Sequence, residues 1–139
     1  MTGQIHDTVI YRGEKYSLVE DSGGLPTPFD YGLIPGQMHT ACWRGFYLTY
    51  IILDVRLVLD QLTIRTFDNN YPPVNGIQPV EDNSNKVYQG LNLTLPYTGK
   101  LVIAKDFMQE KYIHMGFQPA SSFRTVLELT FENGICIRP

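Results

Sequence analysis

The chain lacks the features that mark membrane and secreted proteins. Its longest notable apolar run covers residues 48–53 and is interrupted by Thr49. A membrane-spanning helix needs about twenty consecutive apolar residues, so the sequence predicts none. The first residues, MTGQIHDTVIYRG, contain neither the basic start nor the apolar stretch of a secretory signal. These absences predict a cytoplasmic protein that does not engage a membrane.

Positive charge is also scarce. The formal net charge is −3, the pI is about 5.5, and no two basic residues are neighbours in the chain. Nucleic-acid-binding proteins usually present a basic stripe that meets the phosphates. The charge pattern therefore predicts that nucleic acid is not a partner.

Cysteine is the third scarce residue type, with only Cys42 and Cys136 present. Two distant cysteines in a reducing compartment are usually small buried hydrophobic residues. His39 lies three positions before Cys42, about 10 Å away on an extended chain, which is too far for a catalytic thiol–imidazole pair unless the chain turns at 39–41. No CxxC pair, HExxH motif, nucleophile elbow or phosphate-binding glycine loop is present. The sequence thus predicts no metal and no cofactor, and it does not favour an enzyme.

What the chain does contain is typical of a β protein. Aromatic residues reach 12%, and twelve glycines and nine prolines are scattered between short apolar stretches. At 139 residues, the chain is expected to form one domain, residues 1–139. We predict about eight mainly antiparallel strands in a barrel or a sandwich. At most one short helix is expected, near 107–113, beginning with Asp106 as its cap; a strand over 112–117 is the alternative.

Several local features follow from the pattern of apolar residues. A two-residue turn at Arg12-Gly13 joins the first hairpin, and residues 41–53 form one long strand that bends at Gly45. Asp54-Val55 turns the chain back. Leu57 and Leu59 occupy odd positions whereas Leu62 and Ile64 occupy even ones, so a bulge near Asp60-Gln61 is needed to place all four on one face of the strand. Residues 21–36 and 66–86 are irregular, because they are rich in glycine, proline and asparagine.

The C-terminal hairpin allows two registers. Asn133-Gly134 suits a two-residue type I′ turn, whereas a three-residue loop over 132–134 places Phe131 opposite Ile135. The apolar match favours the three-residue loop. In that register Cys136 points away from the apolar face and lies beside Glu128.

Arg44 is the main candidate for a binding residue. On a strand it would share a face with Cys42 and Phe46, and an arginine there needs a carboxylate, an aromatic ring or a water-filled cavity. We name Asp30 or Asp106 as its structural partner, or an anionic ligand as its functional one.

Three other residues complete the set of ligand-binding candidates. Trp43 adjoins Arg44, although burial on both faces of the strand would also explain it. Tyr112 and His114 lie in an aromatic stretch and would line the same cavity as Arg44. His6, near the chain start, is expected to be solvated.

Two segments carry a resemblance. The strings TACWRGFYLTYIILDVRLVLDQLTI and YTGKLVIAKDFMQEKYIHMGFQPASSFRTVLELTFENGICI cover about half the chain. They resemble a family of small uncharacterised bacterial proteins. The resemblance implies a soluble bacterial cytoplasmic protein, and it transfers no functional residue because no activity is established for the family.

These observations order three hypotheses. The first is a non-catalytic binding or interaction protein, since a small β scaffold with exposed aromatic loops suits a protein partner. The second is a β-barrel that binds a small ligand in a cavity around Arg44. The third is an enzyme that uses that cavity. An exposed edge strand would also allow two copies to pair.

Overall fold

The computed structural model describes residues 4–38, 41–82, 85–112 and 116–138. In these ranges the protein is mainly β, as predicted, with ten strands and three single-turn 3-10 helices. The strands are β1 Thr8–Tyr11, β2 Glu14–Asp21, β3 Phe46–Leu53, β4 Arg56–Ile64, β5 Val80–Asp82, β6 Asn85–Tyr88, β7 Leu93–Thr94, β8 Gly99–Phe107, β9 Phe123–Glu132 and β10 Ile135–Arg138. The 3-10 helices are η1 Pro28–Tyr31, η2 Gln109–Lys111 and η3 Ala120–Ser122.

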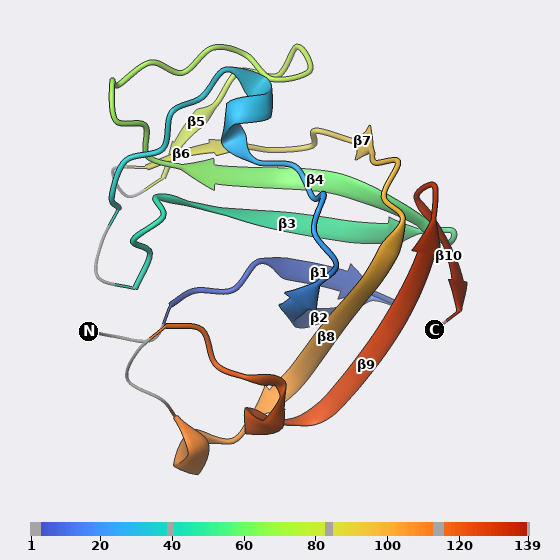
Figure 1. The fold of residues 1–139 in the computed structure, drawn as a ribbon. Helices are drawn as coiled ribbons and strands as arrows, with labels where there is room; N and C mark the ends of the chain where they lie inside the picture. Colours follow the sequence, from blue (N-terminus) through green and yellow to red (C-terminus); the bar gives the residue numbers. More distant parts are fainter. Residues whose placement is uncertain (1–3, 39–40, 83–84, 113–115, 139) are drawn as a thin grey trace.

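All the strands belong to one sheet, which curls partly into a ring (Figure 1). The order is β10-β9-β8-β2-β1-β3-β4-β6-β5, and β7 also pairs with β4. The ring closes only where Ile135 of β10 pairs with Arg56 of β4. Every pairing is antiparallel except β1 with β3, which the chain reaches by a long crossover. The sheet is thus neither a sandwich nor a fully closed barrel.

The first hairpin follows the predicted register. Arg12 and Gly13 both have positive φ, 52° and 78°, as a two-residue type I′ turn requires. Val9 lies opposite Tyr16, and the backbone N–H of Leu18 donates to the carbonyl of Asp7.

The prediction of a strand over 41–53 is wrong for residues 41–45. β3 begins only at Phe46, because the N–H of Gly45 donates back to Cys42 and closes a turn. Gly45 has a φ of 81°, and a Cβ at this position would collide with the carbonyl of Gly36. The predicted bend is therefore the end of a loop rather than a kink within a strand.

The β3–β4 hairpin confirms two local predictions. Asp54 and Val55 form the turn with φ values of 47° and 66°. Thr49 pairs with Gln61 but Tyr50 pairs with Leu59, so Asp60 is the extra residue of a bulge.

The C-terminal hairpin adopts the register that we did not favour. Ile135 pairs with Glu132 and Cys136 with Phe131, so the loop is the two-residue Asn133-Gly134 turn. Gly134 both accepts from the N–H of Leu57 and donates to the carbonyl of Tyr97, which holds the turn in place. Cys136 consequently packs against the core, and Ile137 is left 55% exposed.

The expected helix near 107–113 is only the single turn η2, and two further 3-10 turns occur elsewhere. Its first residue is preceded by Met108, whereas Asp106 belongs to β8 and accepts a hydrogen bond from the Thr125 hydroxyl. Half of the alternative strand over 112–117 lies outside the described residues, and no strand is assigned at 112, 116 or 117. Of the two segments expected to be irregular, 21–36 contains η1, and 66–86 contains β5 and the start of β6.

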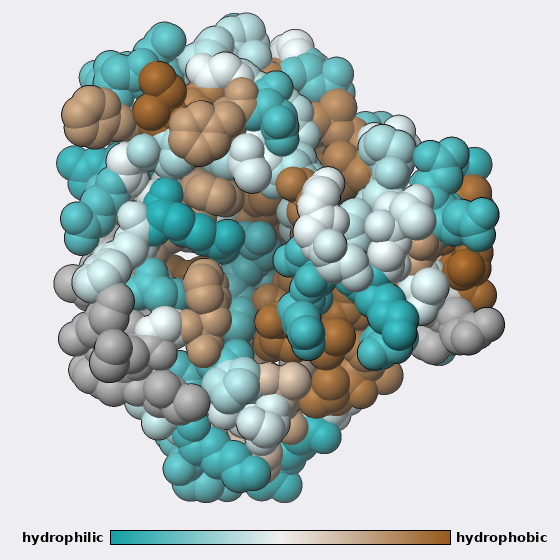
Figure 2. Space-filling view, in the orientation of Figure 1, coloured by the Kyte–Doolittle hydropathy of each residue, from teal (hydrophilic) through white to brown (hydrophobic). Residues whose placement is uncertain are grey.

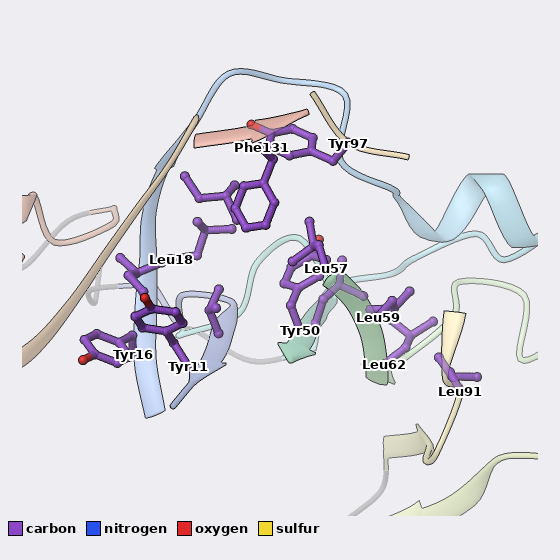
Figure 3. Close-up of a cluster of buried hydrophobic side chains, with 14 of the residues drawn as sticks. Tyr11, Tyr16, Leu18, Tyr50, Leu57, Leu59, Leu62, Leu91, Tyr97 and Phe131 are labelled. Carbon is purple, nitrogen blue, oxygen red and sulfur yellow. The ribbon is translucent and has the colours of Figure 1, made fainter. Parts of the chain in front are cut away.

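The interior of the ring is filled by side chains. Figure 3 shows leucines, tyrosines and Phe131 from several strands converging on one cluster. Among the largest fully buried members are Leu48, Tyr50, Leu57, Leu59, Leu62, Leu101, Ile103 and Phe131. Burying apolar side chains of this size stabilises the fold by roughly 1.5–3 kcal/mol each.

Candidate functional site

Arg44 lies in the loop before β3 and forms an ion pair with Asp7. Its Nη2 is 2.6 Å from Asp7 Oδ1, and Nη1 is 3.5 Å from Oδ2. Asp7 also accepts a 2.8 Å hydrogen bond from the N–H of Leu48. A carboxylate partner was expected, but Asp30 and Asp106 are bonded elsewhere, to the Thr27 N–H and the Thr125 hydroxyl.

Two aromatic rings hold the same guanidinium. The Arg44 carbon Cζ lies 4.7 Å from the centre of the Phe46 ring and 5.5 Å from that of Phe117. Such contacts stabilise a cation by roughly 0.5–2 kcal/mol, depending on how far it is removed from water. Arg44 therefore ties the start of β1, the start of β3 and the segment before η3 together.

His6 is partly buried beside this pair rather than solvated as expected. Its Nδ1 is 3.0 Å from the carbonyl oxygen of Leu18, and its ring packs on Phe117 and Phe123 with centroids 5.1 and 6.1 Å apart. Burial lowers the pKa of His6, and the Arg44 charge adds to this, while the Leu18 hydrogen bond and Asp7 oppose it. The imidazole is thus neutral at pH 7.

Tyr50 is a buried residue whose polar hydroxyl feels the charges of Asp7 and Arg44. It is 1% exposed, and its hydroxyl has no hydrogen-bond partner among the described residues. Burial raises the pKa of Tyr50, and the negative charges of Asp7 and Asp21 raise it further. The strand register accounts for the nearness of these charged groups to Tyr50. Tyr50 pairs with Val9, which shares a face with Asp7, and Asp21 pairs with the buried Leu101.

Two adjoining pockets surround the end of β2, and we call them together the mouth groove. The first has a volume of about 220 Å³ and is lined by His6, Asp7, Leu18, Val19, Glu20, Asp21, Arg44 and Phe117. The second, of about 130 Å³, shares Glu20 and Asp21 and adds Ser22, Lys100, Val102 and Glu128. The groove is a shallow surface feature next to the packed core.

The structure does not bring the other predicted ligand-binding residues to Arg44. Trp43 is 45% exposed, so the expected burial on both strand faces is wrong; its backbone N–H donates to the Gln4 side chain. Tyr112 is exposed and packs edge-on against Phe107. Neither lines the mouth groove. His114 and His39 lie outside the described residues.

Cys42 is buried, as its apolar surroundings predicted. Its Sγ donates to the carbonyl of Phe46 at 3.5 Å, and burial raises the pKa of the thiol. A raised pKa disfavours the reactive thiolate. Cys42 thus belongs to the scaffold.

Sequence reasoning missed three exposed apolar side chains on two joined loops, Phe29, Ile34 and Phe67, which we call together the loop patch. Phe67 is 82% exposed and Phe29 is 65% exposed. The N–H of Phe67 donates to Ile34, and the N–H of Gly36 donates to Arg65, both at 2.8 Å, so two distant loops are joined. Figure 2 shows hydrophobic colours at the end of the molecule where η1 and the 66–79 segment lie in Figure 1. Phe67 stands between Thr66 and Asp68, and Phe29 and Ile34 lie in a segment rich in glycine and proline, so no periodicity marks the three residues.

Other kinds of site are not indicated. Within the described ranges, no group of three or more His, Cys, Asp and Glu residues is arranged to hold a metal ion. No helix in the described part of the chain is long and apolar enough to cross a membrane. Comparisons with protein-family models, curated proteins and solved structures gave no match.

Proposed function

We propose that this chain is a non-catalytic protein-interaction module that contacts its partner through the loop patch. The observation that carries the proposal is the 82% exposure of Phe67 on a backbone fixed to residues 34–36. Exposing an apolar ring to water is unfavourable, and clustered exposed apolar side chains commonly mark protein-binding surfaces. Because the loops are already fixed, binding costs little conformational entropy.

The small-ligand alternative has weaker support. Ligand sites are usually clefts of about 300–1,000 Å³, whereas the pocket beside Arg44 has about 220 Å³. The guanidinium that would have bound an anion already pairs with Asp7. We further propose that the interaction module is bacterial and cytoplasmic, and that two copies can pair through an edge strand.

Photo-crosslinking tests the interaction role. A benzophenone amino acid replaces Phe67 in the native host, and the matched control carries it at Val126, which is also exposed but lies on β9. We expect one discrete crosslinked species from position 67 and none from position 126. With that partner purified, Phe67→Ala should weaken binding at least about tenfold, as for a binding hot spot, and Val126→Ala should not. Equal crosslinking at both positions, or unchanged binding by Phe67→Ala, would refute the proposal.

A further inference from the structure

The ring of strands is open beside its one closing contact. β10 pairs with β4 only at Ile135, and the N–H of the next residue, Cys136, donates to the Val55 carbonyl. Beyond this point a groove of about 380 Å³ lies between β10 and the ends of β1 and β3. We call it the seam groove, and its apolar walls are formed by Tyr11, Ile52, Val55 and Ile137.

The seam groove is bordered by exposed apolar side chains. Ile137 is 55% exposed, Val55 is 53% exposed, and the neighbouring Leu53 is 46% exposed. Figure 2 shows hydrophobic colours at the right edge of the molecule, where β10 and the β3–β4 turn lie in Figure 1. Apolar side chains gathered at the edge of a sheet commonly mark an interaction surface.

The loop patch supplies a side chain of complementary shape. Phe67 protrudes from the surface, and its backbone is held by the hydrogen bond to Ile34. A protruding aromatic ring buries more of its surface in a concave groove than against a flat face. Figure 1 places the 66–79 segment and β10 at opposite ends of the molecule, so Phe67 cannot reach the seam groove of its own chain. Only the groove of another copy can receive it.

The charges beside the two surfaces are also complementary. Arg65 and Asp68 flank Phe67 in the loop patch, and both are exposed. Arg12 and Asp54 line the seam groove, and both are exposed as well. None of these four charges forms an ion pair among the described residues. Each charge beside Phe67 can therefore meet the opposite charge at the groove of a second copy.

The other edge of the sheet does not suit such a contact. It is formed by β5, on which Glu81 and Asp82 are both exposed. Two copies paired antiparallel along β5 would bring these carboxylates together, and like charges directly opposite each other are destabilising. β10 is therefore the edge strand that favours contact between copies.

We propose that the seam groove receives Phe67 of a second copy of this chain, so that β10 of one copy lies against the 65–68 loop of the next. This inference rests on the proposed interaction role of the loop patch and identifies the partner as a second copy. Because the two surfaces differ, the association is head-to-tail and continues from copy to copy unless a ring closes.

Sedimentation velocity of the purified full chain, at concentrations up to about 1 mM, is the test. We expect wild type to form species larger than a dimer as the concentration rises. Phe67→Ala should weaken this association at least about tenfold, as loss of a hot-spot aromatic does, and Ile137→Glu should do the same by placing a charge in the groove. Val126→Glu is the matched control, because Val126 is an exposed apolar residue on β9, away from both surfaces, and it should associate as wild type does.

Mixing the two variants isolates the head-to-tail contact. Phe67→Ala keeps its groove, and Ile137→Glu keeps its Phe67. We therefore expect each variant alone to stay monomeric, while the mixture forms a dimer that grows no further. Formation of this dimer also shows that both variants are folded.

Three results would overturn the inference. They are a wild type that stays monomeric, association that survives either substitution, and a mixture that forms no dimer. The interaction role is tested separately by photo-crosslinking at Phe67. If that experiment captures a different protein while the chain itself stays monomeric, only the pairing of copies through the seam groove fails.

Discussion

Asp7 and Arg44, 37 positions apart in the chain, meet at a distance of 2.6 Å between Oδ1 and Nη2. Asp7 leads into β1, and Arg44 precedes β3, the strand that pairs with β1 in parallel. The pair thus closes the one parallel junction of the described sheet. Arg44, the main binding candidate in the sequence, therefore forms a structural link between two strands.

Removing Arg44 should destabilise the fold. Arg44→Ala leaves the largely buried Asp7 carboxylate with only the Leu48 N–H, and it uncovers Phe46 and Phe117. We expect the free energy of unfolding to fall by about 2 kcal/mol, measured by urea denaturation. Lys100→Ala, which breaks an exposed ion pair with Glu128, should cost less than about 1 kcal/mol. Equal losses in the two variants would show that the Arg44–Asp7 pair is no stronger than a surface pair.

His6 should make the protein less stable in mild acid. Burial lowers its pKa below the ordinary value of 6.5, so the unfolded chain binds a proton more readily than the folded one. The stability that neutral His6 contributes is fully present above pH 6.5 and is lost as the pH falls below 6.5 toward the folded-state pKa.

The measurement compares wild type with His6→Gln by denaturant unfolding at several pH values from about 7.5 to 5. We expect a smaller decrease in stability with falling pH in the variant, because glutamine does not titrate. The other titrating groups are common to both proteins and cancel. An identical slope in both would mean that His6 takes up a proton without cost to the fold.

Features set by neighbouring residues could be predicted from the sequence. The first hairpin, its Arg12-Gly13 turn and the bulge at Asp60 all follow from the alternation of apolar residues along one strand or hairpin. The C-terminal register could not be predicted in this way. Its choice depends on contacts of Gly134 with the distant Leu57 and Tyr97, which outweigh the exposure of Ile137.

The candidate site was less predictable than the fold. The sequence pointed to Arg44 and to its need for a carboxylate, but only the parallel pairing of β1 with β3 selects Asp7. We assumed that residues 41–45 form a strand with both faces buried, which placed Trp43 in the core. These residues form a loop instead, and Trp43 is exposed. The loop patch could not be predicted from the sequence, because contacts between residues 34–36 and 65–67 join segments without regular structure.

The crossing of these two loops with the start of β3 depends on Gly45. Its φ of 81° is unfavourable for any other residue type, and a Cβ would collide with the Gly36 carbonyl. Gly45→Ala should lower the free energy of unfolding by about 3 kcal/mol, measured by urea denaturation. Gly13→Ala is the control, since Gly13 has a φ of 78° but open space around it, and it should cost only about 1 kcal/mol. If the two variants lose the same stability, the loops yield to the added methyl group and do not fix the loop patch rigidly.

Val55 should be replaceable with a gain in stability. It occupies the second position of a type I′ turn with a φ of 66°, where a β-branched side chain is strained. Val55→Gly removes this strain and leaves the Cys136 N–H free to donate to the residue 55 carbonyl as before. We expect the thermal unfolding midpoint to rise, with a gain of about 1 kcal/mol after the larger chain entropy of glycine in the unfolded state is included. Val126→Gly, on an exposed site in the middle of β9, should instead lower the midpoint, because glycine weakens a strand. A fall in both variants would mean that contacts of the Val55 side chain stabilise the hairpin by more than its backbone strain costs.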